Sequence, residues 1–548
     1  MHNLLFKFIF KFSNHQIPKF CIYLCSVMEK RVRTRFAPSP TGGLHLGGVR
    51  TALYNYLYAK HFGGDFVLRI EDTDQTRFVP GAEEYIVETL KWCGIEPDES
   101  PFKPGAYAPY RQSERKPMYR EYAEKLIANG QAYYAFDTPE ELTAMRENFK
   151  TEQNPSPKYD FSLREKMNNS LTLSAAEVQQ KINDGVPYVV RIKMPENEHV
   201  QFRDLIRGDV RFNTSEVDDK VLLKADGMPT YHLAVVVDDY LMQISHAFRG
   251  EEWLPSAPVH IKLWEYLFGL ENMPEWAHLP LILKPDGKGK LSKRDGAKLG
   301  FPVFAMNWTD PRDNEFTEGF REKGFVPQAF VNMLALIGWH DGTEQEVFSL
   351  SELVEKFDIA RVHKGGAKFN YTKALWFNKE WIKLLSGLEL EPQVKQLLLA
   401  DGVTEKQIDS DAILAGIIDM TKDRCTLLPD FVTQTDFFFR RPAHIDTASA
   451  IKKWDPSYAV FYKENLIPAY DSCQNWDAEN LEIIFNETTT AAGIEKPGNL
   501  MLPLRIMLVG GKFGPHVFDI AALIGKKESI ARLQEGLDAI EKAFAEKT

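Results

Sequence analysis

Glycines, lysines and a single histidine mark two stretches of the chain that could handle phosphate groups. Residues 33–48, RTRFAPSPTGGLHLGG, set four glycines and two prolines around His45. Residues 281–298, LILKPDGKGKLSKRDGAK, carry five lysines and one arginine among three glycines. Glycines let a backbone approach a ligand closely, and lysines supply mobile positive charge. Both stretches are therefore candidates for contact with a polyphosphate, although a lysine run alone is usually a solvated face.

The first stretch has the layout of a strand, a glycine-rich turn and a helix. Residues 32–36 alternate like a short strand, and Pro38 and Pro40 forbid its continuation. From Leu46 onward apolar residues recur at helical spacing. This layout places anions at a helix N-terminus, where unpaired N–H groups favour them. Because neither GxGxxG nor GxxxxGK[ST] is present, an ordinary turn between a strand and a helix explains the stretch alone equally well.

Acidic and basic residues follow other predicted strands. The apolar run 66–70 leads directly into EDTDQTR, residues 71–77, and a later strand near 243–248 ends in RGEE, residues 249–252. Open α/β sheets place ligand groups at the carboxyl ends of their strands. Residues 111–225 change character, with an expected helix over 119–128 and expected strands around PYVVRIKMP and VQFRDLIRGDVRF. We therefore expect an α/β domain whose two halves are separated by an inserted α+β domain.

Length and composition indicate a multidomain globular protein. The chain has 548 residues, 44% hydrophobic and 26% charged, with a formal net charge of −11. That balance argues against uniform wrapping of nucleic acid but allows a local basic track. Five cysteines without metal-site spacing favour a reduced, cytoplasmic protein. No apolar run is long enough to span a bilayer, so we expect no membrane association.

The first 27 residues stand apart from the rest. They are aromatic, contain lysines and have no acidic residue, and their apolar run is interrupted by Lys7, Lys11 and Lys19. This pattern makes a poor secretory signal. Met28 would be a natural start before the first strand. We predict that residues 1–27 are a dispensable extension.

Four separated stretches, taken together, resemble one family. APSPTGGLHLGG is similar to the HIGH signature and KLSKR, residues 290–294, to the KMSKS loop. RIEDTD (69–74) and PTYHLAVVVDD…RGEEW (229–253) resemble an amino-acid site, and KFNYTKALWFNKEWI (368–382) and GPHVFDIAALIGKKESIARL (514–533) resemble later domains. From about Met28 to its end, the chain resembles the bacterial glutamyl-tRNA synthetases, which are class I aminoacyl-tRNA synthetases.

The resemblance implies a fold and a domain order. The fold class is α/β, a Rossmann-like class I catalytic domain with an α+β insertion, followed by a helical anticodon-binding region. The expected domains are the catalytic domain in two parts (28–110 and 229–283), an inserted acceptor-binding domain (111–228), a segment with the KMSKS-like loop and a stem-contact domain (284–385), and the helical region (386–548).

The resemblance also implies a reaction. Glutamate and ATP form glutamyl-adenylate and pyrophosphate, and the glutamyl group passes to the 3′ end of tRNA(Glu). The nucleophile is already an anion, so the protein mainly positions the reactants and stabilises phosphate charge. The implied partners are tRNA(Glu), L-glutamate, and ATP as co-substrate with Mg²⁺, and the implied state is a cytoplasmic monomer.

Site residues follow by position in the motifs. His45, Lys290 and Lys293 are the expected catalytic residues. The expected glutamate-binding residues are Arg35, Ala37, Ser39, Glu71, Tyr231 and Arg249. The expected ATP-binding residues are Gly42, Gly43, His45, Gly47, Gly48, Glu252, Lys290, Leu291, Ser292, Lys293 and Arg294. For Arg35 and Arg249, a purely structural ion pair is the alternative interpretation.

Some positions depart from the family pattern. Ala135 and Asp137 stand where many relatives have zinc-binding cysteines, so we expect no zinc and no metal site of the protein's own. Val235 replaces a frequent asparagine, and residues 301–320 look like an extra segment. Three alternatives stay open: an enzyme that also charges tRNA(Gln), a glutaminyl-tRNA synthetase, and a tRNA-binding protein that has lost its chemistry. The last is disfavoured by the intact His45 and lysine loop.

Overall fold

The structure, a computed structural model, describes residues 31–547, apart from the side chains of Lys293, Arg294 and Ala297. The expected extension 1–27 lies outside these residues. The chain divides into two compact units. The first comprises the described residues up to Ile282 with Gly338–Thr343 and Ser351–Ala367, and the second comprises Leu283–Ile337, Glu344–Leu350 and the described residues from Lys368 onward.

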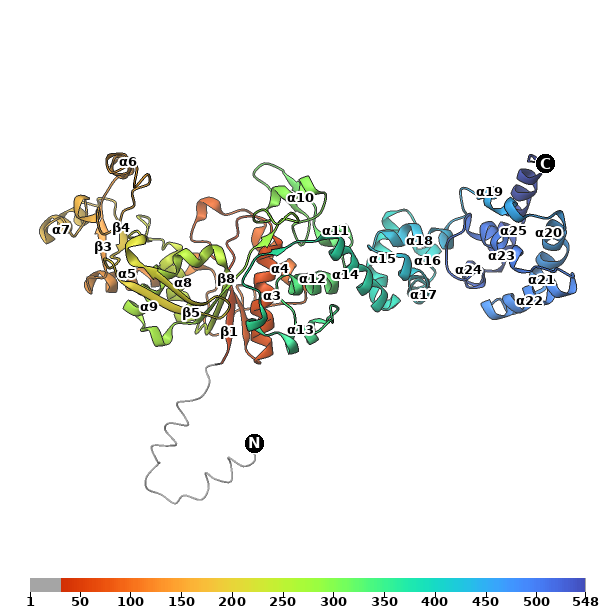
Figure 1. The fold of residues 1–548 in the computed structure, drawn as a ribbon, viewed down its shortest axis with the longest axis horizontal. Coiled ribbons are helices and arrows are strands. Elements are labelled where there is room, and N and C mark those ends of the chain that lie inside the picture. Colours follow the sequence, from red (N-terminus) through yellow and green to blue (C-terminus); the bar gives the residue numbers. More distant parts are fainter. Residues whose placement is uncertain (1–30, 548) are drawn as a thin grey trace, which may run out of the picture. The chain divides into compact units, whose positions relative to one another are not determined.

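A six-stranded sheet in the order β2-β1-β8-β9-β5-β6 organises the first unit. Figure 1 labels three of its strands, β1, β5 and β8. Its strands are β1 (Arg33–Phe36), β2 (Asp65–Leu68), β5 (His199–Asp204), β6 (Gly208–Asn213), β8 (His246–Gly250) and β9 (Glu275–Leu279). β1 pairs in parallel with both β2 and β8, and β9 pairs in parallel with both β8 and β5. The carboxyl ends of these five strands therefore share one edge.

The expected strand, turn and helix at the first motif is confirmed. α3 (Leu46–His61) begins directly after His45 and packs on β1, β2 and β8. Gly42 has φ 137°, a backbone conformation that favours glycine. Pro38 and Pro40 follow the last strand residue, Phe36, as the sequence predicts.

The inserted region is not wholly separate from the catalytic sheet. β3 (Ala132–Ala135), β4 (Val189–Ile192) and β7 (Val221–Leu223) form an antiparallel sheet of their own. The hairpin β5–β6, expected within the insertion, instead extends the catalytic sheet beside β9. Its inward residues Val200 and Phe202 join the same core as α8 (Tyr231–Leu241) and α9 (Ala257–Leu267). Hydrophobic burial explains this partition, because the alternating hairpin has one apolar face to cover.

Four more α-helices lie between α3 and α8 in the first unit, and α5 is the helix expected over 119–128. They are α4 (Ala82–Trp92), α5 (Lys116–Ala128), α6 (Pro139–Asn148) and α7 (Ala175–Asn183). Thr138 caps α6 ahead of Pro139, in a reciprocal pairing with Glu141. The apolar run 233–237 belongs to α8. The later strand starts at His246 rather than near 243.

The second unit is mostly helical. Its shorter elements include α10 (Lys293–Leu299), α11 (Phe320–Lys323) and the hairpin of β11 (Trp308–Thr309) and β12 (Phe316–Thr317), which occupies the extra segment 301–320. Its other helices are α12 (Pro327–Leu336), α14 (Tyr371–Leu384), α15 (Gly387–Ala400), α16 (Glu405–Ile408), α17 (Asp411–Thr421), α18 (Asp430–Phe439), α19 (Thr447–Ala450), α20 (Pro456–Val460), α21 (Ile467–Ser472), α22 (Ala478–Ala491), α23 (Gly498–Val509), α24 (Val517–Ile524) and α25 (Lys526–Ala545).

Three elements lie where the chain crosses between the units: β10 (Ile282–Leu283), α13 (Leu350–Lys356) and β13 (Ala367–Lys368). The helices after α18 enclose a core of their own, with Tyr462, Leu481 and Leu504 among its fully buried members. Among the helices of residues 31–547, none combines the length and apolarity required to cross a membrane.

Candidate active site

Backbone pairing brings the first acidic cluster beside the first motif. Past the end of β1, the amide of Arg69 donates to Phe36 O at 3.0 Å and the amide of Glu71 donates to Pro38 O at 2.9 Å. Ala37 and Ser39 therefore lie along the same edge as Glu71. Ser39 is exposed and Ala37 half-buried, so this backbone stays accessible to a ligand.

His45 is held in place by the turn that it caps. Its Nδ1 accepts from the amide of Gly47 at 3.2 Å, at the N-terminus of α3. A neutral imidazole carries one proton, so this contact puts the proton on Nε2. His45 can then donate from Nε2 at a helix terminus that already favours anions.

Arg35, Arg69, Glu71 and Asp239 form a buried network with balanced charge. Arg35 Nε and Arg69 Nη1 both contact Asp239 Oδ1, at 3.2 Å and 2.7 Å, and Arg69 Nη2 contacts Glu71 Oε1 at 3.1 Å. Burial raises the pKa of Glu71, although the charge of Arg69 acts in the opposite direction. The pKa of Asp239 is lowered despite its burial, because Arg35 and Arg69 both face this carboxylate. Two arginines thus meet two carboxylates, and the ionic alternative proposed for Arg35 describes its contacts.

Arg249 has a different environment, because its partners are neutral. Its side chain stands at the end of β8 and the residue is 6% exposed. Nε donates to His278 Nε2 at 3.0 Å, and Nη1 lies 3.1 Å from both Tyr231 Oη and His260 Nδ1. Nη2 is buried without a hydrogen-bond partner. Within residues 31–547, no carboxylate forms an ion pair with Arg249.

The histidines around Arg249 are kept neutral. Burial, together with the charge of Arg249, lowers the pKa of His260 well below its usual value. Burial also lowers the pKa of His232, to about 4, and His232 Nδ1 lies 3.2 Å from His260 Nε2. The rings can therefore present lone pairs to the guanidinium without competing for an anion. Burial raises the pKa of Tyr231. The charges of Arg249, Glu71 and Arg35 also act on this pKa, so the four side chains lie in one region.

The lysine loop, residues 284–298, belongs to the second unit and leads into helix α10. Leu291 is fully buried, whereas Lys290 and Ser292 are exposed. Ser292 Oγ donates to Asp295 Oδ2 at 2.6 Å, in a capping box that starts α10. The expectations for the side chains of Lys293 and Arg294 lie outside what the structure describes. Glu252 is exposed in the turn that follows β8 in the first unit.

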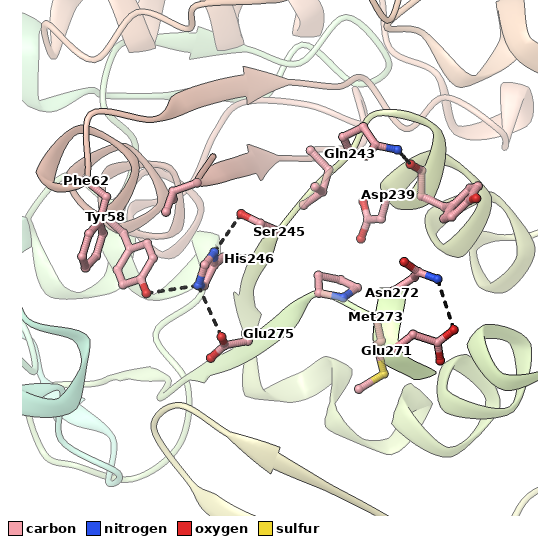
Figure 2. A pocket seen from close by; sticks show the side chains of 14 residues that line it. Tyr58, Phe62, Asp239, Gln243, Ser245, His246, Glu271, Asn272, Met273 and Glu275 are labelled. Carbon is pink, nitrogen blue, oxygen red and sulfur yellow. Dashed lines mark hydrogen bonds and ion pairs between the residues drawn. The ribbon is translucent and has the colours of Figure 1, made fainter. Parts of the chain in front are cut away.

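The cavity in Figure 2 lies at the opposite edge of the sheet. It has a volume of about 500 Å³ and is lined by His246 and Glu275, the first residues of β8 and β9. His246 contacts Tyr58 Oη at 3.1 Å and Ser245 Oγ at 2.9 Å. Ligands of such sheets bind at the carboxyl ends, so we do not assign this cavity to the substrates, although Asp239 lines it as well as contacting Arg35.

Sequence reasoning missed the neighbours that hold the arginines. Asp204, Asp239, His260 and His278 are all buried and polar, and none was named as a site residue. Asp239 could have been suspected, because the apolar run before it ends in two aspartates. His278 interrupts the apolar strand EWAHL, which is a detectable signal, whereas Asp204 lay in a segment assigned to the insertion.

Comparisons with known proteins agree with these observations. A family model described as "tRNA synthetases class I (E and Q), catalytic domain" matches residues 31–376, and an "Anticodon binding domain" model matches 389–537. The chain is 49% identical to a glutamate–tRNA ligase of Christiangramia forsetii and 50% identical to one of Flavobacterium johnsoniae, covering 94% of this chain and 100% of each relative.

A solved structure gives the same result for the fold. The crystal structure of a glutamate tRNA ligase from Elizabethkingia meningosepticum, in complex with its amino acid, matches with a TM-score of 0.84 at 46% identity. The match covers 93% of this chain and 100% of that one. The expected fold class, an α/β class I catalytic domain followed by a helical anticodon-binding region, is confirmed. The chain belongs to the glutamate–tRNA ligase family of class I aminoacyl-tRNA synthetases.

Proposed function

We propose that the protein is a glutamate–tRNA ligase that reads the side-chain carboxylate of glutamate with Arg249. Membership of the family carries the reaction: ATP activates glutamate, and the glutamyl group is transferred to tRNA. One observation carries the residue assignment, namely the buried Arg249 guanidinium whose Nη2 has no hydrogen-bond partner and whose hydrogen-bond partners at Nε and Nη1 are all neutral. A buried cation without a counter-charge is costly, so it favours an anionic ligand.

The other site residues take roles that suit their positions. Glu71 lies beside Ala37 and Ser39 and would hold the amino group of glutamate, while Tyr231 orients Arg249. Arg35 already faces Asp239, so we assign it a smaller part in substrate selection than Arg249. The glycines 42, 43, 47 and 48 let the ATP phosphates reach the start of α3, where His45 would donate from Nε2.

The lysine loop would supply the remaining phosphate contacts. Lys290 and Lys293 are proposed to stabilise charge on the leaving pyrophosphate, and Glu252, Leu291, Ser292 and Arg294 complete the ATP-binding set. Within the described part of the chain, no cluster of three potential metal ligands occurs. We therefore propose that Mg²⁺ arrives with ATP, held mainly by phosphate oxygens and water.

Finer properties are part of the proposal. We propose a cytoplasmic monomer that charges tRNA(Glu), with residues 111–228 meeting the acceptor end and residues 386–548 the anticodon. The glutaminyl alternative is not favoured, because the relatives above are glutamate–tRNA ligases.

The test is charging of purified tRNA by this chain. Wild-type protein should attach glutamate to tRNA(Glu) in the presence of ATP and Mg²⁺ and should not attach glutamine. A parallel reaction with tRNA(Gln) decides whether that tRNA is charged as well. Failure to charge tRNA(Glu), with a protein shown to be folded, would refute the proposal.

A further inference from the structure

We propose that Asp204 and His278 are positioning residues that aim Arg249 at the substrate, by fixing which ring nitrogen of His278 carries the proton. This inference rests on the proposed function, because it concerns how the carboxylate-binding guanidinium is held. Neither residue belongs to a signature motif, and both lie on strands at the site edge: Asp204 ends β5 and His278 lies in β9.

Asp204 is saturated by donors in a buried site. Its Oδ1 accepts from the amides of Ile206 and Arg207, at 2.9 Å and 2.8 Å. Its Oδ2 accepts from the amide of His278 at 3.1 Å and lies 2.6 Å from His278 Nδ1. Asp204 and His278 are 1% and 0% exposed, so water does not replace these partners. The carboxylate therefore demands a donor at Nδ1.

The proton on Nδ1 determines that the Nε2 atom of His278 accepts a hydrogen bond from Arg249. With the proton on Nδ1, neutral His278 has a lone pair at Nε2, and Arg249 Nε donates to it at 3.0 Å. Burial lowers the pKa of His278, which is consistent with the neutral ring. Arg249 is then fixed at Nε by His278 and at Nη1 by Tyr231 and His260. Nη2 is the atom left to meet a ligand.

Replacing Asp204 by asparagine should reverse the ring proton. The two turn amides of Ile206 and Arg207 keep the side-chain oxygen on their side, so the NH₂ group of the amide faces His278 Nδ1. Nδ1 must then accept, and the proton moves to Nε2, where it faces the N–H of Arg249. Two N–H groups then face each other, so the hydrogen bond from Arg249 Nε to His278 is lost and the Arg249 side chain is no longer held in its orientation. A carboxylate that fixes an imidazole tautomer acts in the same way in the serine-protease triad.

The first experiment measures steady-state charging by Asp204→Asn alone and in a His278→Gln background. Glutamine has a carbonyl oxygen within reach of Arg249 Nε and no ring nitrogen facing residue 204. We expect Asp204→Asn to raise KM for glutamate roughly 10- to 100-fold, the loss of one hydrogen bond to a charged group, with KM for ATP little changed. In the His278→Gln background, Asp204→Asn should change the logarithm of KM for glutamate by less than about a third of its change in the wild-type background.

A second pair of variants keeps the inference testable if Asp204→Asn does not fold. His278→Gln should keep KM for glutamate within a few-fold of wild type, because it still accepts from Arg249. His278→Asn should raise KM for glutamate, because its shorter amide reaches Asp204 but not Arg249. Thermal unfolding of both variants controls for general loss of structure.

The outcomes separate this inference from the proposed function. An unchanged KM for glutamate in Asp204→Asn, equal losses in both backgrounds, or a His278→Gln enzyme worse than His278→Asn would each overturn the inference. None of those results overturns the proposed role of Arg249, which is tested separately by the Arg249→Gln variant.

Discussion

Replacing Arg249 by glutamine is the sharpest perturbation of the site. Glutamine is nearly as large as glutamate, so size separates these two substrates poorly, whereas charge can separate them. If Arg249 binds the substrate side chain as proposed, bound glutamate gives the buried guanidinium its counter-charge in the wild-type protein, and bound glutamine leaves it uncompensated. Leaving one partner of a buried pair alone costs about 3–5 kcal/mol. The wild type should therefore prefer glutamate by roughly 10²- to several 10³-fold from this contact.

In the Arg249→Gln variant the uncompensated buried charge would belong to the substrate rather than to the protein. The glutamate carboxylate would now be buried without a cation, so kcat/KM for glutamate should fall by roughly the same 10²- to several 10³-fold. The value for glutamine should change much less, so the gap between the substrates narrows. KM for ATP should stay within a few-fold of wild type, because Arg249 faces the amino-acid site.

The assay is tRNA-dependent pyrophosphate exchange with each amino acid, over a range of glutamate, glutamine and ATP concentrations. Arg31→Gln is a matched control, because the exposed Arg31 forms an ion pair with Asp65 at the amino ends of β1 and β2, away from the candidate site, and the variant should behave as wild type. Near-normal use of glutamate by Arg249→Gln, with its full preference over glutamine, would show that Arg249 does not read the substrate.

Four further predictions concern the whole protein. Glutamate activation is expected to need tRNA, as the family resemblance implies, so robust pyrophosphate exchange with ATP and glutamate alone would disprove it. Purified protein should contain no stoichiometric zinc by metal analysis, because Ala135 and Asp137 replace expected ligands, and about one zinc per chain would expose a missed site. A chain starting at Met28 should fold and charge tRNA normally, and a large loss of activity would show that residues 1–27 matter. Acid should destabilise the first unit through His246, because burial lowers the pKa of this histidine from 6.5 to about 4 in the folded protein. Between about pH 6.5 and pH 4 the unfolded state binds more protons than the folded state, so the free energy of unfolding should fall by up to about 3 kcal/mol as the pH drops. Thermal unfolding of His246→Phe should depend less on pH over this range than that of the wild type.

The sequence predicted the elements whose signals are local. Proline and glycine at 38–48 define the end of β1 and the turn before α3. The sequence also singled out Glu71, Tyr231 and Arg249 as glutamate-binding residues, and that role stays a prediction. Such features depend on backbone sterics and capping within a few residues, and so they can be read without tertiary information.

Long-range pairing was the part that could not be predicted. The strand β5 pairs with β9, about 70 residues later, and nothing in VQFRDLIRGDVRF distinguishes an edge of the catalytic sheet from a strand of the insertion. For the same reason Asp204 escaped notice, since its role exists only once His278 lies beside it. Arg35 and Arg249 looked alike in sequence, and only their neighbours, Asp239 for one and neutral rings for the other, distinguish them.

A crystal structure of this protein with glutamate bound would test the proposed role of Arg249 most directly. We predict that the side-chain carboxylate accepts a hydrogen bond from Arg249 Nη2, at about 2.7–2.9 Å, while Arg249 Nε still donates to His278 Nε2. A glutamate whose side-chain carboxylate lies away from Arg249, paired with another cation or with water alone, would contradict it.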